Sequence, residues 1–270
     1  MSEKEIVAKA FSDLAQYEAD VAKTEDEIEL YRLNKMQPMI DRRDKIIDNI
    51  PEFWKVVLSQ HTNFADYVRA SDFKYIDAIK KVRIDWLVLE DPKAYSIGDF
   101  KLTIEFGEIK GDFKAQIVEK VFRLIKKEQS KGEENDNGDD DDDALEDEQL
   151  VSEPTAIEWP KSYNSINPDL ITDKRSKEGK KNYRQGMKSL FGWFKWTGRK
   201  PGKEFPHGDS LATLFSEDLY PYCVKYYTEA QRDLEDEEDD SEDSSAEEPL
   251  DLEDDSEQES GPDKKKIKLD

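Results

Sequence analysis

Residues 3–31 decide the N-terminal architecture and read EKEIVAKAFSDLAQYEADVAKTEDEIELY. Apolar residues recur in this stretch every seven positions, at Val7, Leu14, Val21 and Ile28. A second set follows three positions after each of them: Ala10, Tyr17, Thr24 and Tyr31. A seven-residue repeat of this kind lies on one face of a helix and is typical of a coiled-coil seam.

The stripe then changes phase and continues. Alternating spacings of four and three residues recur at Met36, Ile40, Arg43, Ile47, Ile50, Trp54 and Val57. The pattern therefore predicts one long helix over residues 1–58, which Pro38 bends but does not end. A helix of that length spans roughly 75–90 Å at ~1.5 Å per residue, so one small body cannot cover its whole stripe.

A second copy of the chain would cover the stripe, and we expect a homodimer through this helix. The alternative is an intramolecular hairpin, which would have to turn near Asn34. The expected dimerisation residues are Val7, Leu14, Val21, Ile28, Met36, Ile40 and Ile47.

Residues 59–232 have the pattern of an α+β domain. After a short helical stretch at 71–79, apolar residues alternate over 82–88, 100–106 and 113–125, which predicts antiparallel strands. The alternation slips at Ile117 and Val118, which suggests a bulge, and it resumes at 155–159. Helices are expected at 176–195 and at 210–234, with Pro221 interrupting the second.

The net charge of −24 comes from two acidic runs. Residues 133–148 hold 11 acids among 16, residues 233–259 hold 17 among 27, and neither contains Lys or Arg. The rest of the chain has 37 acids (65 less 28) against 41 bases, so it is nearly neutral. We therefore expect a disordered acidic insertion at about 130–150 and a disordered acidic tail over 233–270. Such runs can screen a cationic partner or simply keep the protein soluble.

Little in the chain suggests catalysis. His61 and His207 are its two histidines and Cys223 is its one cysteine, too few to build a nucleophilic triad or a zinc site. We expect no enzyme activity, no cofactor and no metal, and we interpret Cys223 as a buried small apolar residue. A single cysteine also favours a reducing compartment, and no apolar run approaches the ~20 residues that cross a bilayer, so no membrane partner is expected.

Two basic stretches have different interpretations. Residues 173–203 carry 11 bases and two acids among five aromatic residues, a combination that can bind nucleic acid. We favour core positions for these aromatics and expect weak nucleic-acid binding at most. They are Tyr183, Phe191, Trp193, Phe194 and Trp196. The compact cluster of Lys264, Lys265, Lys266 and Lys268 resembles a nuclear import signal, which would bring in an importin and place the protein in the nucleus.

Several strings resemble the nucleosome assembly protein and SET family of histone chaperones. The first is Ile50-Pro51-Glu52-Phe53-Trp54, followed by Leu58 and His61. Residues 189–194, 217–221 and 225–227 resemble that family's C-terminal signature in the same order, and residues 29–36 and 69–77 resemble a fungal member.

The resemblance implies a headphone-shaped dimer in which paired long helices carry α+β "earmuff" domains. It further implies that Glu217 and Asp218 bind core histones, with a preference for the histone three and four pair. A fungal histone acetyltransferase is the other implied partner. The alternative function is a general acidic adaptor or enzyme inhibitor of the SET type.

Overall fold

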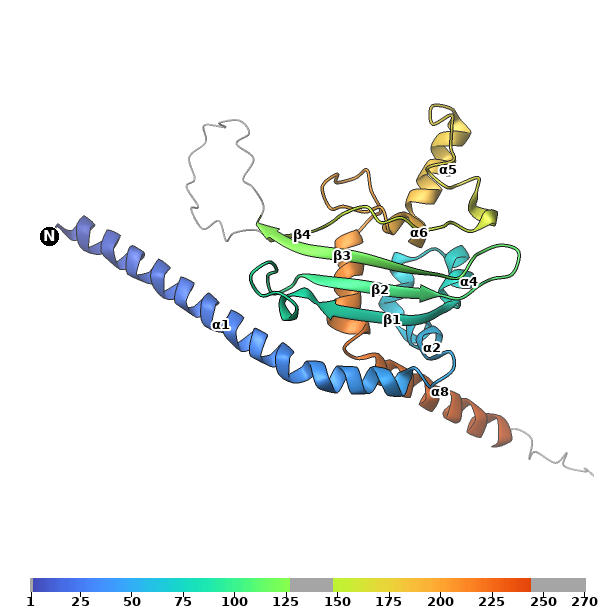
Figure 1. The fold of residues 1–270 in the computed structure, drawn as a ribbon, viewed down its shortest axis with the longest axis horizontal. Coiled ribbons are helices and arrows are strands. Elements are labelled where there is room, and N and C mark those ends of the chain that lie inside the picture. Colours follow the sequence, from blue (N-terminus) through green and yellow to red (C-terminus); the bar gives the residue numbers. More distant parts are fainter. Residues whose placement is uncertain (1, 127–147, 244–270) are drawn as a thin grey trace, which may run out of the picture. The chain divides into compact units, whose positions relative to one another are not determined.

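The computed structural model describes residues 2–126 and 148–243, with side chains described as far as Asp233 (Figure 1). The chain divides into two units, residues 1–231 and residues 232–270. The first unit contains a long helix, a four-stranded sheet and most of the shorter helices. Of the second unit, the structure describes only the C-terminal part of helix α8.

Helix α1 spans Glu3–Ile47 and begins with a capping box. The Ser2 side chain accepts from the backbone amide of Glu5, and the Glu5 carboxylate accepts from that of Ser2. The helix continues through Pro38, as the sequence predicts. It ends at Ile47, however, so the expected boundary at residue 58 is wrong. Pro51 and a left-handed Glu52 (φ 56°) reverse the chain before α2, Phe53–Gln60.

The stripe of α1 divides into an exposed part and a buried part. Val7, Leu14, Val21 and Ile28 are all exposed within this one chain, as a seam awaiting a partner requires. Ile47 is only 5% exposed because it belongs to the core of its own chain, so its expected place in the seam is wrong. Two further expected seam residues lie between these extremes of exposure. Met36 is 38% exposed, and Ile40 packs partly against the core.

The sheet is an antiparallel meander in the order β1-β2-β3-β4. Its strands are β1 (Ile79–Trp86), β2 (Phe100–Phe106), β3 (Gln116–Lys126) and β4 (Glu148–Ser152). The register of β2 and β3 is regular through Ile117 and Val118, so the bulge predicted there is wrong; the irregularity lies in β1 between Ile79 and Lys81.

Strand β4 lies where the sequence suggested the end of the acidic insertion. It pairs with β3 from Lys126↔Glu148 to Phe122↔Ser152, so residues 148–150 are part of the sheet. The strand expected at 155–159 does not form. After Ser152 the chain leaves the sheet edge, and the amide of Thr155 donates to the carbonyl of Phe194 at 2.8 Å. Residues 127–147, most of the expected insertion, lie outside the described residues.

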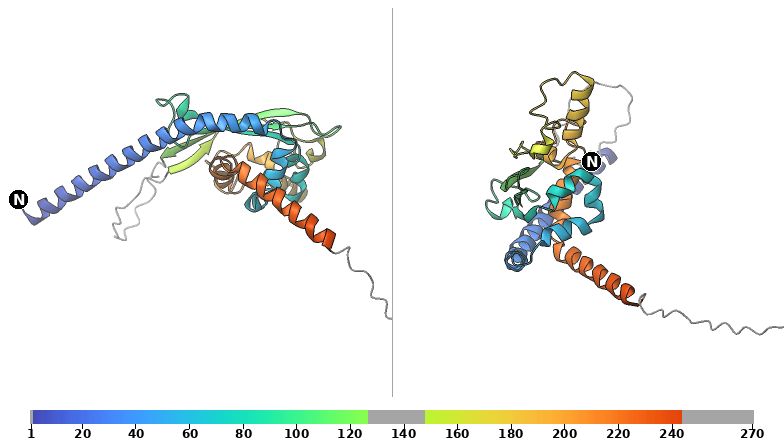
Figure 2. Two further views of the ribbon diagram at one scale, coloured as in Figure 1. Left: turned by 90° about the horizontal axis from the view of Figure 1, so that it is seen from below. Right: turned by 90° about the vertical axis from the view of Figure 1, so that its right-hand side faces the viewer.

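The remaining helices are short except α8, and several of the short ones pack on one face of the sheet (Figure 2). They are α3 (Thr62–Tyr67), η1 (Ala70–Asp72), α4 (Phe73–Ile76), η2 (Leu87–Leu89), η3 (Lys161–Tyr163), α5 (Lys177–Met187), α6 (Leu190–Trp193), α7 (Gly208–Thr213), η4 (Leu214–Leu219) and α8 (Cys223–Asp243).

The helix expected at 176–195 is two helices. Ser189 caps α6 through its hydroxyl, and the buried Asp72 accepts hydrogen bonds from that hydroxyl and from the amide of Leu190. This cap holds the start of α6 against η1 and breaks the continuous helix. The helix expected at 210–234 is interrupted near Pro221, as predicted, but it also contains the π-helical turn η4. Its second part, α8, continues to Asp243, so the prediction of a disordered tail is wrong for residues 233–243.

The core lies between the sheet and these helices and is rich in aromatic side chains. The prediction that the aromatics of 173–203 anchor the core is confirmed for Phe191, Trp193, Phe194 and Trp196, which are buried; Tyr183 is half-buried. Phe191 alone makes edge-on or tilted contacts with Tyr75, Phe113, Trp159 and Tyr163. Cys223 is fully buried, as expected, and burial raises the pKa of its thiol to about 11.

Candidate functional site

The expected acidic pair, Glu217 and Asp218, lies on η4. Phe215 and Leu219 of the same turn are fully buried, so they anchor it while the two carboxylates face outward. π-Helical turns are rare in proteins, and those that occur are often found at functional sites. The structure therefore places this pair on a turn that two buried apolar side chains anchor.

The two carboxylates differ in their partners. Glu217 is exposed and has no hydrogen bond or ion pair with the described residues. Asp218 is half-buried and uses both oxygens: the Tyr226 hydroxyl donates to Oδ1 at 2.5 Å, and His61 Nε2 lies 3.1 Å from Oδ2. Glu217 is thus free to meet a ligand, whereas Asp218 is already held by its own chain.

The other ring nitrogen of His61 determines which nitrogen faces Asp218 with a proton. Its Nδ1 accepts a hydrogen bond from the amide of Phe64 and so caps α3. In the neutral ring the proton must then sit on Nε2, which donates to Asp218. Partial burial alone would raise the pKa of Asp218, but the hydrogen bonds from Tyr226 and His61 outweigh it and hold that pKa below its ordinary value.

A hollow of about 420 Å³ adjoins this pair. Its rim carries a third carboxylate, Asp209 of α7, and the ring of Tyr67 from α3. Three carboxylates around an open hollow suit the cationic end of a Lys or Arg side chain, which carboxylates bind by charge-assisted hydrogen bonds. Sequence analysis missed Asp209 and Tyr67 because no local pattern links them to η4.

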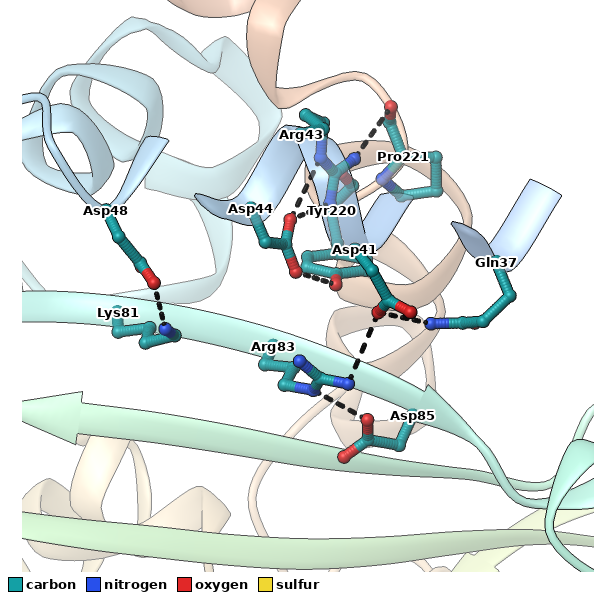
Figure 3. Close-up of polar contacts among 10 residues, drawn as sticks. All are labelled: Gln37, Asp41, Arg43, Asp44, Asp48, Lys81, Arg83, Asp85, Tyr220 and Pro221. Carbon is teal, nitrogen blue, oxygen red and sulfur yellow. Dashed lines mark hydrogen bonds and ion pairs between the residues drawn. The ribbon is translucent and has the colours of Figure 1, made fainter. Parts of the chain in front are cut away.

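A polar cluster fastens η4 to α1 (Figure 3). The Tyr220 hydroxyl donates to Oδ2 of Asp44 at 2.6 Å, while Arg43 donates to the other oxygen of Asp44 and to the carbonyl of Tyr220 at 2.6 Å. The Arg43 guanidinium also lies over the Tyr220 ring, 4.4 Å from its centroid. The carboxylate pair is therefore tied to the helix that carries the seam.

Ion pairs add a second attachment between α1 and β1 (Figure 3). Lys81 contacts Asp48 at 2.6 Å, and Arg83 bridges Asp85 at 2.7 Å and Asp41 at 3.6 Å. Partly exposed pairs of this kind contribute little each to stability.

Other expected features are placed as follows. The lysines of the import cluster, Lys264 to Lys268, lie outside the described residues, as does most of the acidic tail. Within the described part, no group of three or more His, Cys, Asp or Glu residues could hold a metal ion. None of the helices described there is long and apolar enough to span a membrane.

Comparisons with known proteins identify relatives along most of the chain. No family model matches the sequence. Vacuolar protein sorting-associated protein 75 of Saccharomyces cerevisiae is 61% identical over 234 residues, 87% of this chain and 83% of that protein. A putative nucleosome assembly protein of Schizosaccharomyces pombe is 29% identical over 240 residues, 87% of this chain and 85% of that one.

The fold agrees with this relationship. A crystal structure of Vps75 superposes with a TM-score of 0.74 at 59% identity, covering 83% of this chain and 99% of that one. The α+β architecture predicted from the sequence, with a long N-terminal helix and an antiparallel sheet packed by helices, is thus that of solved relatives. Identity at this level over most of both chains confirms the resemblance found in the sequence: the chain belongs to the nucleosome assembly protein family of histone chaperones.

Proposed function

We propose that this protein binds core histones at the acidic hollow on η4 and transfers them during nucleosome assembly. The observation that carries this proposal is the contrast between Glu217, a carboxylate without a partner in the described chain, and Asp218, which its neighbours hold in place. A pre-positioned carboxylate beside a free one can meet a histone Lys or Arg without reorganising the turn.

Two copies would present two such hollows. The exposed stripe at Val7, Leu14, Val21 and Ile28 supports a homodimer through α1, since four apolar side chains in one line on an isolated helix otherwise remain in water. The ties between α1 and η4 support a fixed geometry between the seam and each hollow. Shape matching between two hollows and one histone complex would then add to charge attraction.

The acidic runs supply long-range attraction in this proposal. Polyanionic segments raise the encounter rate with basic proteins, and salt screens their effect. Release needs no nucleotide, because DNA and the chaperone compete for the same basic histone surfaces. The family relationship further supports a preference for the histone three and four pair and the presentation of histones to a histone acetyltransferase.

Charge reversal of the pair tests the proposal. Glu217→Lys with Asp218→Lys should weaken histone binding at least tenfold, about 1.4 kcal/mol, in isothermal titration with purified histone complexes. A melting curve of the same variant separates lost binding from lost folding. Unchanged affinity in a well-folded variant would remove this pair from the site.

A pull-down from nuclear extract separates this function from that of an acidic adaptor or enzyme inhibitor of the SET type. Core histones should dominate the bound fraction, and the charge-reversal variant should lose them. Recovery of one enzyme in place of histones, equally with both proteins, would favour the adaptor.

Nuclear entry is proposed to depend on the C-terminal lysine cluster. Changing Lys264, Lys265, Lys266 and Lys268 to Ala in a fluorescent fusion should move the signal to the cytoplasm, because an importin reads a compact run of positive charge. An unchanged nuclear signal would assign import to another sequence or to a bound partner.

A further inference from the structure

Helix α5, drawn in yellow, projects beyond the sheet (Figures 1 and 2). Five exposed bases lie along it, from its first residue to its C-cap, each three or four residues from a neighbour. They are Lys177, Lys180, Lys181, Arg184 and Lys188. At ~100° per residue these positions fall within an arc of about 100°, so the five side chains share one side of the helix. We call this side the basic face of α5.

Two buried glycines fix which side of α5 is turned outward. Gly179 and Gly186 lie on the side of the helix opposite the basic face. A Cβ at Gly179 would be 1.8 Å from the carbonyl oxygen of Asp173, and one at Gly186 would be 1.9 Å from that of Ile166. The backbone of α5 therefore rests directly on segment 166–173, and the five bases are turned away from that segment.

The bases of this face have no acidic partner. None of the five makes a side-chain hydrogen bond or an ion pair with any described residue. Glu178, the one acid within α5, lies about 100° round the helix from Lys177, on the flank of the face. Asp173, just before the helix, accepts hydrogen bonds from the amides of Arg175 and Ser176.

The loop near the end of α5 has mixed charge. Arg184 and Lys188 border a hollow there, and its other charged residues are of both signs. These are Glu148, Lys200, Lys203, Glu204 and Asp209. The uniform positive charge is therefore confined to α5 itself.

The basic face offers charge but no apolar anchor. No large apolar side chain is exposed between residues 171 and 203, whereas the centres of protein interfaces are enriched in apolar and aromatic residues. Tyr183, the aromatic residue of α5, is half-buried, with Nζ of Lys174 4.9 Å from its ring centroid. Single-stranded nucleic acid is bound by stacking its bases on exposed aromatic rings, which this face does not have. The phosphates of a duplex require only positive charge.

We propose that the basic face of α5 binds the phosphate backbone of double-stranded DNA, without sequence preference. The face is about 16–17 Å long at ~1.5 Å per residue, and a duplex carries one negative charge per about 1.7 Å of its axis, so several phosphates lie within reach. Phosphate contacts position a protein on DNA and carry no sequence information. Because the net charge of the chain is −24, we expect this binding to be weak and sensitive to salt.

This inference stands on the bases of α5 and does not rest on the histone hollow at η4. If both sites bind their ligands, one chain holds a histone and the DNA that receives it. Failure of either site leaves the other testable, because the two ligands are titrated separately.

Anisotropy of a labelled duplex tests the proposal with the full-length chain. A short fluorescein-labelled duplex is titrated at low salt, and a single strand of the same length is titrated for comparison. The duplex should bind more tightly than the single strand. Absence of duplex binding, or equal or tighter binding of the single strand, would overturn the proposal.

Substitutions on α5 locate the binding. Lys177→Ala, Lys181→Ala and Lys188→Ala together should weaken duplex binding at least tenfold. The slope of log affinity against log salt should become shallower by about 2.7, since each lost phosphate contact removes about 0.9. The melting temperature should not fall, because the three side chains are exposed and Ala favours the helix.

A matched control separates the basic face from net charge. Lys45→Ala, Lys80→Ala and Lys110→Ala remove the same charge from exposed lysines outside α5 and should change duplex affinity less than twofold. Equal losses in the two triple variants would mean attraction to net charge alone and would reject the face. Histone affinity of the α5 variant should stay within twofold of the wild type, and a parallel loss of both ligands would contradict a separate DNA site.

Competition separates DNA from an acidic protein as the ligand. Unlabelled duplex should displace the labelled duplex more effectively than polyglutamate at equal total charge. Equal or stronger competition by polyglutamate would assign the basic face to an acidic protein segment and overturn the proposal.

Chemical acetylation maps the contact in the unaltered chain. Duplex DNA should slow the acetylation of Lys177, Lys181 and Lys188 at least threefold and leave that of Lys45 and Lys110 unchanged, as measured by mass spectrometry of peptides. Protection spread evenly over both groups of lysines would contradict binding at α5.

Discussion

The hydroxyl of Tyr220 donates a 2.6 Å hydrogen bond to the buried carboxylate of Asp44, 176 positions earlier in the chain. This bond joins the end of η4 to the last turns of α1. Burial and the neighbouring Asp44 carboxylate both raise the pKa of the Tyr220 hydroxyl, so the hydroxyl stays protonated and remains a donor at any physiological pH.

Tyr220→Phe should lower the free energy of unfolding by about 1–3 kcal/mol, because it leaves one oxygen of a buried carboxylate without a donor. Urea denaturation at pH 7 measures this loss. The double variant Tyr220→Phe with Asp44→Asn should show a coupling energy in a double-mutant cycle. Strict additivity would mean that the two groups do not interact in solution.

Glu217 and Asp218 should separate binding from stability. Glu217→Gln should weaken histone binding several-fold and leave the melting temperature unchanged, since Glu217 has no partner in the described chain. Asp218→Asn should lower the melting temperature, because it disturbs the bonds to Tyr226 and His61. Titration calorimetry measures the histone affinity of each variant, and a thermal melt measures its stability. The reverse assignment of the two effects would contradict the geometry.

The stability that Asp218 supplies should depend on pH. Its pKa is lowered in the folded state, so its contribution is present above the unfolded value, near 3.8, and is lost as the pH falls through the folded value. The difference in unfolding free energy between the wild type and Asp218→Asn should therefore shrink below pH 4. A difference that stays constant from pH 6 to pH 3 would show that the carboxylate charge is irrelevant.

The seam and the core should respond differently to the same substitution. Leu14→Asp with Val21→Asp should yield a monomer by light scattering at micromolar concentration while the sheet domain still melts cooperatively, because both side chains are exposed in the single chain. Ile47→Asp should instead destabilise the domain by several kcal/mol, since it buries an unpaired charge. A wild-type protein that runs as a monomer would reject the proposed dimer.

Lys120 of β3 should stabilise the fold although it is a charged residue in the core. Its side chain is fully buried, and its ammonium donates to the carbonyls of Glu153, Phe194 and Trp196 at 2.9–3.0 Å. Lys120→Met would remove a donor from all three carbonyls. Those of Phe194 and Glu153 would keep the amide of Thr155 and the hydroxyl of Ser152, whereas that of Trp196 would have no donor among the described residues, so the change should cost about 1–3 kcal/mol.

The unfolding free energy that Lys120→Met loses relative to the wild type should grow with pH. Burial lowers the pKa of Lys120 to about 7, from an ordinary 10.5. Between these values the unfolded chain binds more protons than the folded one, so the wild type gains stability as the pH rises from 7 towards 10, and the Met variant lacks that gain. Urea titrations of both proteins at pH 7 and pH 9 check the sign. An equal difference at both values would mean that Lys120 does not titrate in this range.

The sequence by itself determined the elements that depend on local periodicity. The seven-residue stripe from Val7 to Ile28 identified α1, and alternation identified β1, β2 and β3, because helix and strand geometry impose these periods on neighbouring residues. The strings around residues 50–54 and 189–194 identified the family. The acidic pair was predicted from the same likeness, with its buried neighbours Phe215 and Leu219.

Residues that follow one sequence pattern can have different environments and partners, and only the tertiary structure decided these. Ile47 continues the stripe of α1 but is buried in the core; Asp218 is bound by its own chain while the adjacent Glu217 is not. Lys120 interrupts an apolar face, yet it is satisfied by carbonyls 33 to 76 positions away. Such partners meet only when distant segments pack together, so their contacts depend on the three-dimensional path of the chain and leave no periodic trace in the sequence.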